Sequence, residues 1–435
     1  MQRKTVWSLV STVALLLVLC SAWASFAADV EISLWTAYGT SGAVFETFAE
    51  EYMAAHPGVK INIGIFPARA LEEKLTISLP SGTSGDIIEE TAFAIAPYVQ
   101  AGLIAEPPAW VKEFVNTSVY KLMRQGVYIN SDLLGSPSVA GLKYLYWNKS
   151  MFEEAGLPGP PKTLDELKDY AQKLVQYDKN GNVIRSGISL RLSGGGYGVA
   201  EKWWMLALAP YGGSPLIETA PGKYTGGFDT EATQKAVQLY LDLLYNLKVD
   251  SYAVEHGVDA FTRETTAMFE REGFVIANLA KYAPDVKYGI APCVGQDYWG
   301  TLCVNSIFMV AQNSSHKDVA WDFIHFISNK QNTSRLYEEA GWNPVRSDVD
   351  YSDIYAKQPM YQFMQDFPEG YGAYFYPTIV PWNEIWIKTG EWLATLFTQE
   401  QLANDPEKLA AKCQQFNEQV NMILDDNGLY APNDS

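Results

Sequence analysis

The chain has 435 residues, with 50 acidic against 32 basic side chains and a formal net charge of −18 at pH 7. This excess of negative charge disfavours nucleic acid and anionic lipid surfaces as partners, because basic patches supply most of the affinity for both. The length exceeds what one ordinary hydrophobic core supports, so we expect two lobes.

The N-terminus has the pattern of a cleavable signal peptide, which we assign to residues 1–27. Arg3 and Lys4 form a short positive segment, residues 10–19 are apolar, and residues 25–27 place small side chains where a signal peptidase cleaves. An apolar run of this length is too short to cross a bilayer comfortably as a helix, which disfavours a membrane anchor. We therefore expect a mature chain that begins at Ala28 in the periplasm or another extracytoplasmic compartment.

The cysteines offer two further interpretations. Cys20 leaves lipid anchoring as an alternative, which we disfavour because Leu19, and not a small residue, precedes it. Cys293 and Cys303 are close in sequence and are candidates for a disulfide across a turn in an oxidising compartment. Spacing alone does not establish that their Cα atoms approach closely enough.

Strands and helices alternate in the first part of the mature chain. Strands are predicted from alternating or continuous apolar residues at 30–34, 59–65 and 86–88, and helices from apolar stripes at 44–53 and 71–79. The order β-α-β-α-β predicts a parallel, doubly wound sheet. Ligands bind outside the carboxyl ends of the strands in such sheets. This rule points to residues 35–40, 66–69 and 89–93.

A second helical unit follows. Thr163 and Glu166 form a capping box, and an apolar stripe runs through residues 164–175. Residues 229–247 predict another amphipathic helix. Between the two lies a glycine-rich segment, residues 193–204, in which three consecutive glycines at 194–196 are expected to form a flexible turn.

Motifs of one known family recur in order along the chain. The first part contains HPGVK at residues 56–60, GDII at 85–88 and AGLI at 101–104. Residues 145–152 read LYWNKSMF, residues 155–157 read AGL, and residues 160–167 read PPKTLDEL. Segments 261–268, 289–292 and 320–324 continue the series. Together they resemble the bacterial extracellular solute-binding proteins of the family that includes maltose-binding protein. Trp147, Ser150 and Leu164 depart from the usual motif.

The resemblance implies a type II periplasmic-binding-protein fold of the α/β class. Each lobe would be a doubly wound sheet flanked by helices, with the ligand cleft between the lobes. The implied lobes comprise residues 28–137 with 300–342, and residues 138–299 with 343–435. The implied function is the extracytoplasmic substrate-binding component of an ABC importer, a monomer without a cofactor. It would bind a mono- or oligosaccharide, close by a hinge motion and deliver the ligand to permease subunits in the inner membrane.

The same resemblance selects candidate ligand contacts. Position relative to the family motifs selects Glu90, Thr91, Phe93, Glu201, Trp204, Phe274 and Trp386. Five further aromatic residues are expected at turns or strand ends facing the cleft, namely Trp35, Tyr38, Trp299, Trp342 and Trp382. An aromatic face suits the C–H face of a pyranose, although core packing is the competing role of every such residue. Arg69 and Arg191 would favour an acidic sugar if both line the cleft.

The sequence favours binding over a catalytic function. A glycosidase needs two carboxylates at a defined separation, and pairs such as Glu89/Glu90 and Glu270/Glu272 arise by chance among 50 acids. No catalytic residue or metal ligand is therefore assigned, and Asp178 with Asn180 and Asn182 is interpreted as a turn and not as a calcium loop. A polyamine or a phosphate ester remains an alternative ligand for the same fold. The sequence predicts binding without catalysis.

Overall fold

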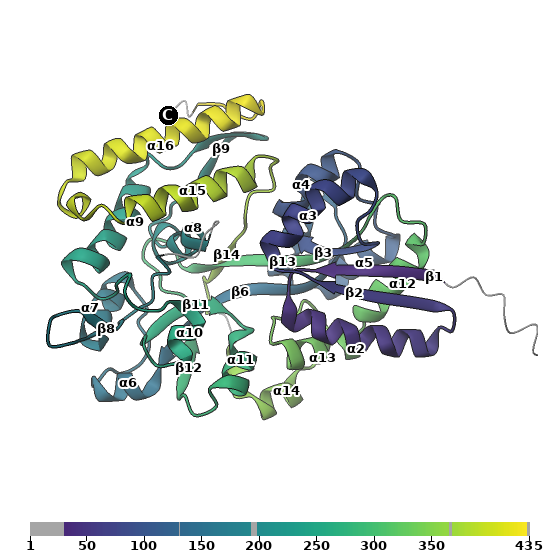
Figure 1. The fold of residues 1–435 in the computed structure, drawn as a ribbon, viewed down its shortest axis with the longest axis horizontal. Helices are drawn as coiled ribbons and strands as arrows, with labels where there is room; N and C mark the ends of the chain where they lie inside the picture. The colour runs from purple at the N-terminus through teal and green to yellow at the C-terminus, as the bar shows by residue number, and fades with distance from the viewer. Residues whose placement is uncertain (1–29, 130, 193–197, 365–367, 433–435) are drawn as a thin grey trace, which may run out of the picture.

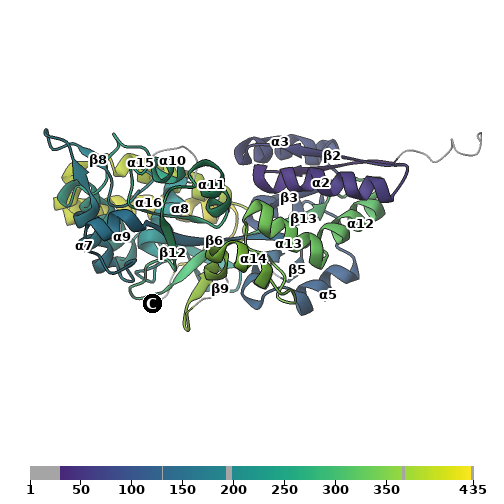
Figure 2. The ribbon, with the colours of Figure 1, turned by 90° about the horizontal axis from the view of Figure 1, so that it is seen from below.

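The computed structural model describes residues 30–129, 131–192, 198–364 and 368–432. The predicted signal peptide, Cys20 and the glycines at 194–196 lie outside these ranges. Figure 1 shows two bodies of helices and strands side by side, with β6, β13 and β14 running between them. Figure 2, turned by 90°, shows β6 crossing from one body to the other. No helix in the described ranges is both long and apolar enough to cross a membrane.

The main sheet has eight strands. Six of them lie in the order β11-β6-β13-β3-β1-β2, while β12 pairs with β6 and β14 pairs with β13. Their bounds are β1 Val30–Thr36, β2 Val59–Ile65, β3 Ile87–Thr91, β6 Ser136–Asn148, β11 Met268–Glu272, β12 Tyr288–Ala291, β13 Gly300–Val310 and β14 Gly372–Tyr374. Strand β1 is parallel to both β2 and β3, which confirms the predicted parallel arrangement. The long strands β6 and β13 are antiparallel to each other.

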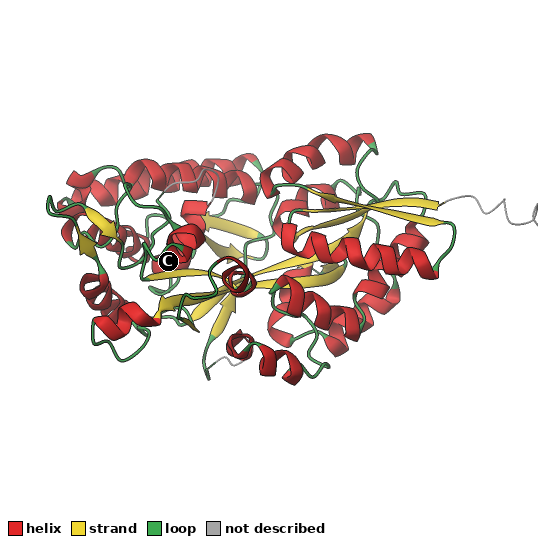
Figure 3. Ribbon diagram, turned by 60° about the horizontal axis from the view of Figure 1, so that its bottom comes forward, coloured by secondary structure: helices red, strands yellow, loops and turns green. Residues whose placement is uncertain are grey.

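Helices cover the strands on the outer sides of both bodies (Figure 3). In the first body and along the crossing strands they are α2 Gly39–Ala55, α3 Ala68–Ser81, α4 Ala92–Gln100, α5 Ala109–Ser118, α12 Lys317–Ile327, α13 Lys330–Ala340 and α14 Ser352–Lys357. The others are α6 Lys149–Glu154, α7 Leu164–Leu174, α8 Gly198–Trp203, α9 Glu231–Leu241, α10 Gly257–Thr262, α11 Val275–Tyr282, α15 Trp382–Leu396 and α16 Pro406–Asp426. Helices α8 and α9 continue into π-helical turns, η2 Trp204–Leu208 and η3 Asp242–Asn246.

Short elements connect these helices and strands. Three two-stranded hairpins pair β4 Tyr128–Ile129 with β5 Asp132–Leu133, β7 Gln176–Tyr177 with β8 Val183–Arg185, and β9 Leu216–Ala220 with β10 Lys223–Gly226. Three 3₁₀ segments are η1 Lys121–Val127, η4 Pro359–Met364 and η5 Glu400–Asn404. The turn predicted at Asp178 is confirmed between β7 and β8, where Asp178 Oδ1 accepts from the backbone N–H groups of Asn180 and Asn182.

Local sequence explains where helix α7 begins. The hydroxyl of Thr163 accepts from the backbone N–H of Glu166 at 3.2 Å, and Glu166 Oε2 accepts from the backbone N–H of Lys162 at 2.7 Å. Both bonds satisfy N–H groups near a helix start that have no partner within the helix. Leu167 and Leu174 are among the residues that the helix buries. The predicted cap and apolar stripe are confirmed.

Two hydrophobic cores lie on either side of the crossing strands. The first contains Phe45, Ile88 and Phe308 and also includes Val345 and Tyr361, beyond the predicted boundary at residue 342. The second contains residues of α7, α8, α9, α15 and α16. Two cores are what a two-lobed division requires, and the boundaries of the lobes stay a prediction.

The disulfide predicted between Cys293 and Cys303 is wrong, because both residues are buried free thiols. Each thiol has its own acceptor: Cys293 Sγ lies 3.5 Å from the Lys143 carbonyl oxygen, and Cys303 Sγ lies 3.2 Å from Asn305 Oδ1. Burial raises the pKa of Cys303 to about 12 and that of Cys293 well above its usual value. Both therefore behave as small core residues.

Candidate functional site

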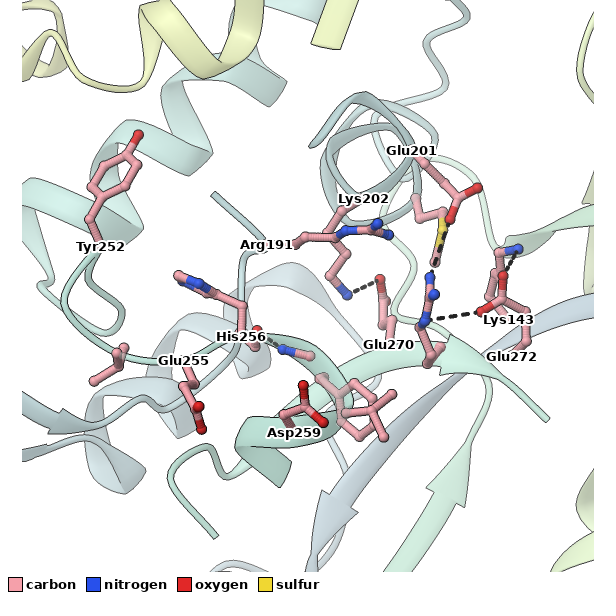
Figure 4. A pocket seen from close by; sticks show the side chains of 17 residues that line it. Lys143, Arg191, Glu201, Lys202, Tyr252, Glu255, His256, Asp259, Glu270 and Glu272 are labelled. Carbon is pink, nitrogen blue, oxygen red and sulfur yellow. Dashed lines mark hydrogen bonds and ion pairs between the residues drawn. The ribbon is translucent and has the colours of Figure 1, made fainter. Parts of the chain in front are cut away.

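A cavity of about 470 Å³ lies between the two bodies and takes side chains from both. It is lined by Tyr38, Ala68, Arg69, Glu72, Glu90, Thr91, Phe93, Lys143, Arg191, Gly198, Glu201, Arg271, Glu272, Val304, Tyr376 and Ile387. A second cavity of about 480 Å³ adjoins it, and five charged residues line both, namely Lys143, Arg191, Glu201, Arg271 and Glu272. We call the two cavities together the cleft. Figure 4 shows the second one, with Tyr252 and His256 at the end opposite Lys143 and Glu272.

The parallel strands explain where the first wall of the cleft lies. Tyr38 follows the carboxyl end of β1, Arg69 follows that of β2, and Thr91 is the last residue of β3. Because parallel strands end at the same edge of a sheet, these side chains meet there. The position of the cavity thus agrees with the three segments selected from the sequence. We call this side the β3 wall.

The opposite side, which we call the β11 wall, is built around paired charges. Strand β11 lies antiparallel to β6, so that Glu272 stands opposite Lys143. Lys143 Nζ lies 2.6 Å from Glu272 Oε1, and Arg271 Nε lies 3.3 Å from Glu272 Oε2. Arg271 Nη1 is also 3.7 Å from Glu201 Oε1, while the Tyr376 hydroxyl donates to Glu201 Oε2 at 2.7 Å. One network therefore joins five side chains.

These cations keep the acid of the β11 wall ionised. Burial by itself would raise the pKa of Glu272, but the positive charges of Arg271 and Lys143 outweigh that effect and lower this pKa to about 2. Glu272 in turn raises the pKa of Arg271. A buried carboxylate beside two cations is stabilised in its charged form.

A second buried ion pair lies deeper on the same wall. Lys202 Nζ lies 3.0 Å from Glu270 Oε2, and the two side chains are 6% and 0% exposed. Burial lowers the pKa of Lys202, and the charge of Glu270 opposes that shift. Figure 4 shows this pair beside Arg191 in the second cavity.

Glu89 and Glu90 on β3 are in a different state, because no cation among the described residues pairs with either of them. Glu90 Oε1 accepts from the backbone N–H of Thr91 at 2.7 Å, while its Oε2 has no hydrogen-bond partner among the residues that the structure describes. Burial, together with the nearby charge of Glu72, raises the pKa of Glu90 to about 8. Glu89 is also buried and accepts from the hydroxyls of Ser138 and Thr36, each at 2.5 Å; burial raises its pKa to about 7. Glu90 is therefore mostly protonated at neutral pH.

Seven of the residues selected from the sequence line the cleft. They are Tyr38, Arg69, Glu90, Thr91, Phe93, Arg191 and Glu201. Arg69 forms ion pairs with Glu72 and Glu73 on its own helix. Phe93 meets the ring of Tyr376 at 4.8 Å between centroids, which gives the cleft an aromatic border.

Three of the selected tryptophans lie beneath the cleft lining, in the second core. Trp204 is 3% exposed, and Trp382 and Trp386 are 0% exposed. Trp382 stacks on Trp386 at 4.9 Å, and the ring of Trp204 lies 5.6 Å from that of Tyr376. Helices α8 and α15 pack against each other and turn these indoles inward. The tryptophans therefore support Tyr376, a residue that does line the cleft.

The other four aromatic candidates are not part of the cleft lining, but Trp342 packs against Tyr38 and Phe274 against Arg271, which are. Trp35 contacts Phe66, and the ammonium group of Lys74 lies 4.5 Å from its ring centroid. Trp299 Nε1 donates to the Cys293 carbonyl at 2.9 Å. Trp342 Nε1 donates to Thr40 Oγ1 at 3.0 Å, and Phe274 lies against the Trp342 ring at 5.3 Å.

Much of the β11 wall was not predicted from the sequence. Lys143, Arg271 and Tyr376 line the cleft but were not selected, and Glu272 was considered only as a possible catalytic acid. A signal was present: Lys143 interrupts a long apolar run, and residues 269–272 read FERE, with charges inside a strand. Charged residues in a buried strand need partners, so they mark a site or a buried ion pair.

A third cavity of about 650 Å³ shares Thr91, Phe93, Val304 and Tyr376 with the first. Tyrosines 128, 224 and 374 also line it. Phe93 and Tyr376 thus border both spaces. Within the described residues, no group of three or more histidine, cysteine, aspartate or glutamate side chains is arranged to hold a metal ion.

Comparison with known proteins places the chain among binding proteins. Residues 36–334 match the family described as bacterial extracellular solute-binding protein. A protein of Brucella abortus (strain 2308), named only as a binding protein, is 27% identical over 385 residues, which cover 85% of this chain and 88% of the relative. A maltotriose-binding protein of Pyrococcus abyssi is 23% identical, with 70% of this chain and 64% of the relative covered.

Solved structures show the same architecture. An ABC transporter solute-binding protein from Thermotoga lettingae, bound with α-D-tagatose, gives a TM-score of 0.75 at 20% identity, covering 91% of this chain and 100% of that one. The GacH receptor of Streptomyces glaucescens, solved unliganded and with acarbose, gives 0.75 at 18% identity, covering 92% and 99%. These likenesses confirm the predicted type II periplasmic-binding-protein fold.

Proposed function

The chain belongs to the family of bacterial extracellular solute-binding proteins, and we propose that it is the substrate-binding component of an ABC importer that captures a mono- or oligosaccharide. The observation that carries the proposal is the cleft, which takes ligand-facing groups from both bodies. Charged and hydroxyl groups there suit sugar hydroxyls, and Tyr38, Phe93 and Tyr376 offer aromatic surface. The names of a maltotriose-binding relative and a tagatose-bound neighbour point to the same ligand class.

Binding and release would follow from movement of the two walls. A ligand that contacts both the β3 wall and the β11 wall stabilises the closed arrangement by its differential affinity for that state. The strands β6 and β13 connect the bodies and are the natural place for the hinge. Permease subunits in the membrane could then distinguish the closed, loaded carrier from the open, empty one. No cofactor and no covalent step are needed.

Export to the periplasm, cleavage before Ala28 and a monomeric state are parts of the same proposal. N-terminal sequencing of protein secreted by a bacterial host would test the cleavage site. Light scattering of the mature protein, with and without ligand, would test the monomer. A chain that starts at residue 1 and stays with the membrane fraction would contradict export by a cleaved signal.

The ligand class is tested by a thermal-shift screen, since a ligand bound only by the folded state raises the melting temperature. The panel contains neutral mono- to tetrasaccharides, uronates, spermidine and sugar phosphates, followed by calorimetric titration of each hit. We expect saccharides to raise the melting temperature. A shift with spermidine alone would contradict the sugar proposal, and release of reducing ends from an oligosaccharide would contradict binding without catalysis.

A further inference from the structure

Among the described residues, Arg191 is the lysine or arginine of the cleft lining that has no ion-pair partner. Four other lysines and arginines line the two cavities, and each has a carboxylate oxygen at 3.3 Å or less, namely Arg69, Lys143, Lys202 and Arg271. Arg191 lines both cavities but makes no hydrogen bond or ion pair within the described part of the chain. Figure 4 shows its side chain extending along the pocket toward the side where Glu201 lies.

The backbone around Arg191 holds this cation in place. The backbone N–H of Leu190 donates to Asp250 Oδ2 at 2.8 Å, and that of Ser189 donates to the Met268 carbonyl at 2.9 Å. Arg191 itself has φ of 53°, in the left-handed region that non-glycine residues rarely adopt. A Cβ at position 198 would lie 2.5 Å from Arg191 Nη2, so the guanidinium rests closely against Gly198 at the start of α8.

The five charged residues that line both cavities carry three positive and two negative charges. Of the five residues that line both cavities, Glu201 and Glu272 interact with Arg271, and Lys143 also pairs with Glu272. Asp259 lines the second cavity without an ion pair of its own, and it is not within ion-pair distance of Arg191. The junction of the two cavities is therefore suited to an anion.

Glu90 gives a second, independent sign of a ligand, in the first cavity. It is only 4% exposed, it lines the first cavity, and its Oε2 has no hydrogen-bond partner. A buried polar atom without a partner is rare in a folded protein unless a ligand or water completes it. A sugar hydroxyl in the first cavity would supply the missing partner, while Arg191 binds a charged substituent at the junction.

We infer that the saccharide bound in this cleft carries a carboxylate, as a uronic acid does, and that Arg191 binds this carboxylate. The inference rests on the proposed function and names the substrate class of the same site. A guanidinium and a carboxylate form two parallel hydrogen bonds, which gives both affinity and orientation. A phosphate monoester carries close to two negative charges at neutral pH. Beside the acids Glu201 and Glu272, the single unpaired cation of Arg191 would not balance both of these charges.

Matched pairs of ligands test the inference by calorimetric titration of the wild-type mature protein. The pairs are galacturonate and galactose, trigalacturonate and α-1,4-galactotriose, and cellobiouronate and cellobiose. In at least one pair we expect the acid to bind about tenfold or more tighter than its neutral counterpart, with a preference that declines as salt is added. The methyl ester of that acid has no charge, and the wild-type protein should bind it no more tightly than the neutral sugar. Because this comparison uses the wild-type protein, it does not depend on whether a variant folds.

Variants then locate the preference. Arg191→Gln should lower the acid-to-neutral affinity ratio about tenfold or more, and Arg191→Lys should restore part of it. The matched control is Arg335→Gln on α13, where Arg335 pairs with Glu51 outside the cleft; its ratio should equal that of the wild type.

Two kinds of failure are distinguishable. Tight binding of neutral sugars with no acid preference, or a preference that Arg191→Gln leaves intact, would overturn this inference and leave the proposed function standing. Glucose 6-phosphate bound more tightly than any uronate would also overturn it. Absence of binding to every saccharide, neutral or acidic, would instead overturn the proposed function and this inference together.

Discussion

The two walls of the cleft shift the pKa values of buried acids in opposite directions. On the β3 wall, Glu89 and Glu90 have hydrogen-bond donors but no cation, and burial raises their pKa values to about 7 and about 8. On the β11 wall, Glu272 lies between Lys143 and Arg271, and its pKa falls to about 2. The carboxyl group of Glu90 is thus mostly protonated at neutral pH, while that of Glu272 is charged. Burial alone does not decide the charge of an acid; its partners do.

Breaking a pair on the β11 wall should have the largest effect on stability. Lys202→Met leaves Glu270 buried without its cation, and we expect a loss of about 3–5 kcal/mol in the free energy of unfolding. The double variant Lys202→Met/Glu270→Gln should recover most of this loss. Urea denaturation measures both. Lys173→Met, in an exposed pair with Asp169, is the control and should cost about 1 kcal/mol or less. Equal losses of unfolding free energy in Lys202→Met and Lys173→Met would contradict the expected difference between a buried and an exposed ion pair.

The β3 wall should respond to pH instead. Glu90 binds its proton more tightly in the folded than in the unfolded state, so its contribution to stability is complete below pH 4.5, the unfolded pKa, and is lost as the pH rises through about 8. Between pH 6 and pH 9 we expect a decline on the order of 3 kcal/mol from this group. Denaturation at each pH should show a flatter profile for Glu90→Gln. A profile as steep as that of the wild type would show that Glu90 is not the titrating group.

A single hydrogen bond on the β11 wall should have the smallest effect. Tyr376→Phe removes the donor to Glu201 Oε2 and should cost about 1.5 kcal/mol, because hydrogen bonds to charged groups contribute more than neutral ones. Since Tyr376 and Glu201 both line the cleft, ligand affinity should fall as well. Denaturation and calorimetric titration measure the two effects. Tyr245→Phe, which removes a hydroxyl bonded to the Phe397 carbonyl, should leave affinity unchanged, because neither residue lines the cleft.

The same comparison explains what could be predicted from the sequence. The β3 wall follows from strand order, because Tyr38, Arg69 and Thr91 come directly after or at the ends of parallel strands. The β11 wall depends on the pairing of β6 with β11, which are far apart in the chain, and no local pattern shows that Lys143 faces Glu272. Strand periodicity therefore predicted the β3 wall but not most of the β11 wall.

The tryptophans show the other limit of sequence reasoning. Trp204 and Trp386 were selected by motif position, yet both are buried under the cleft lining. An indole packs in a core as well as it stacks on a sugar, and the choice depends on how α8 and α15 pack. Alanine at either position would remove core volume, so a loss of binding there would not by itself identify a ligand contact.

Strand β6 has a consequence for how the molecule bends. Ser138 on this strand holds Glu89 of the β3 wall, and Lys143, five positions later, holds Glu272 of the β11 wall. Five residues of extended chain span about 17 Å. Each wall is thus attached to one end of the same short segment of β6. If β6 bends and both attachments persist, the bend must come from the torsion angles of residues 139–142. In the proposed closure these four residues would bend together with β13, which also joins the two bodies.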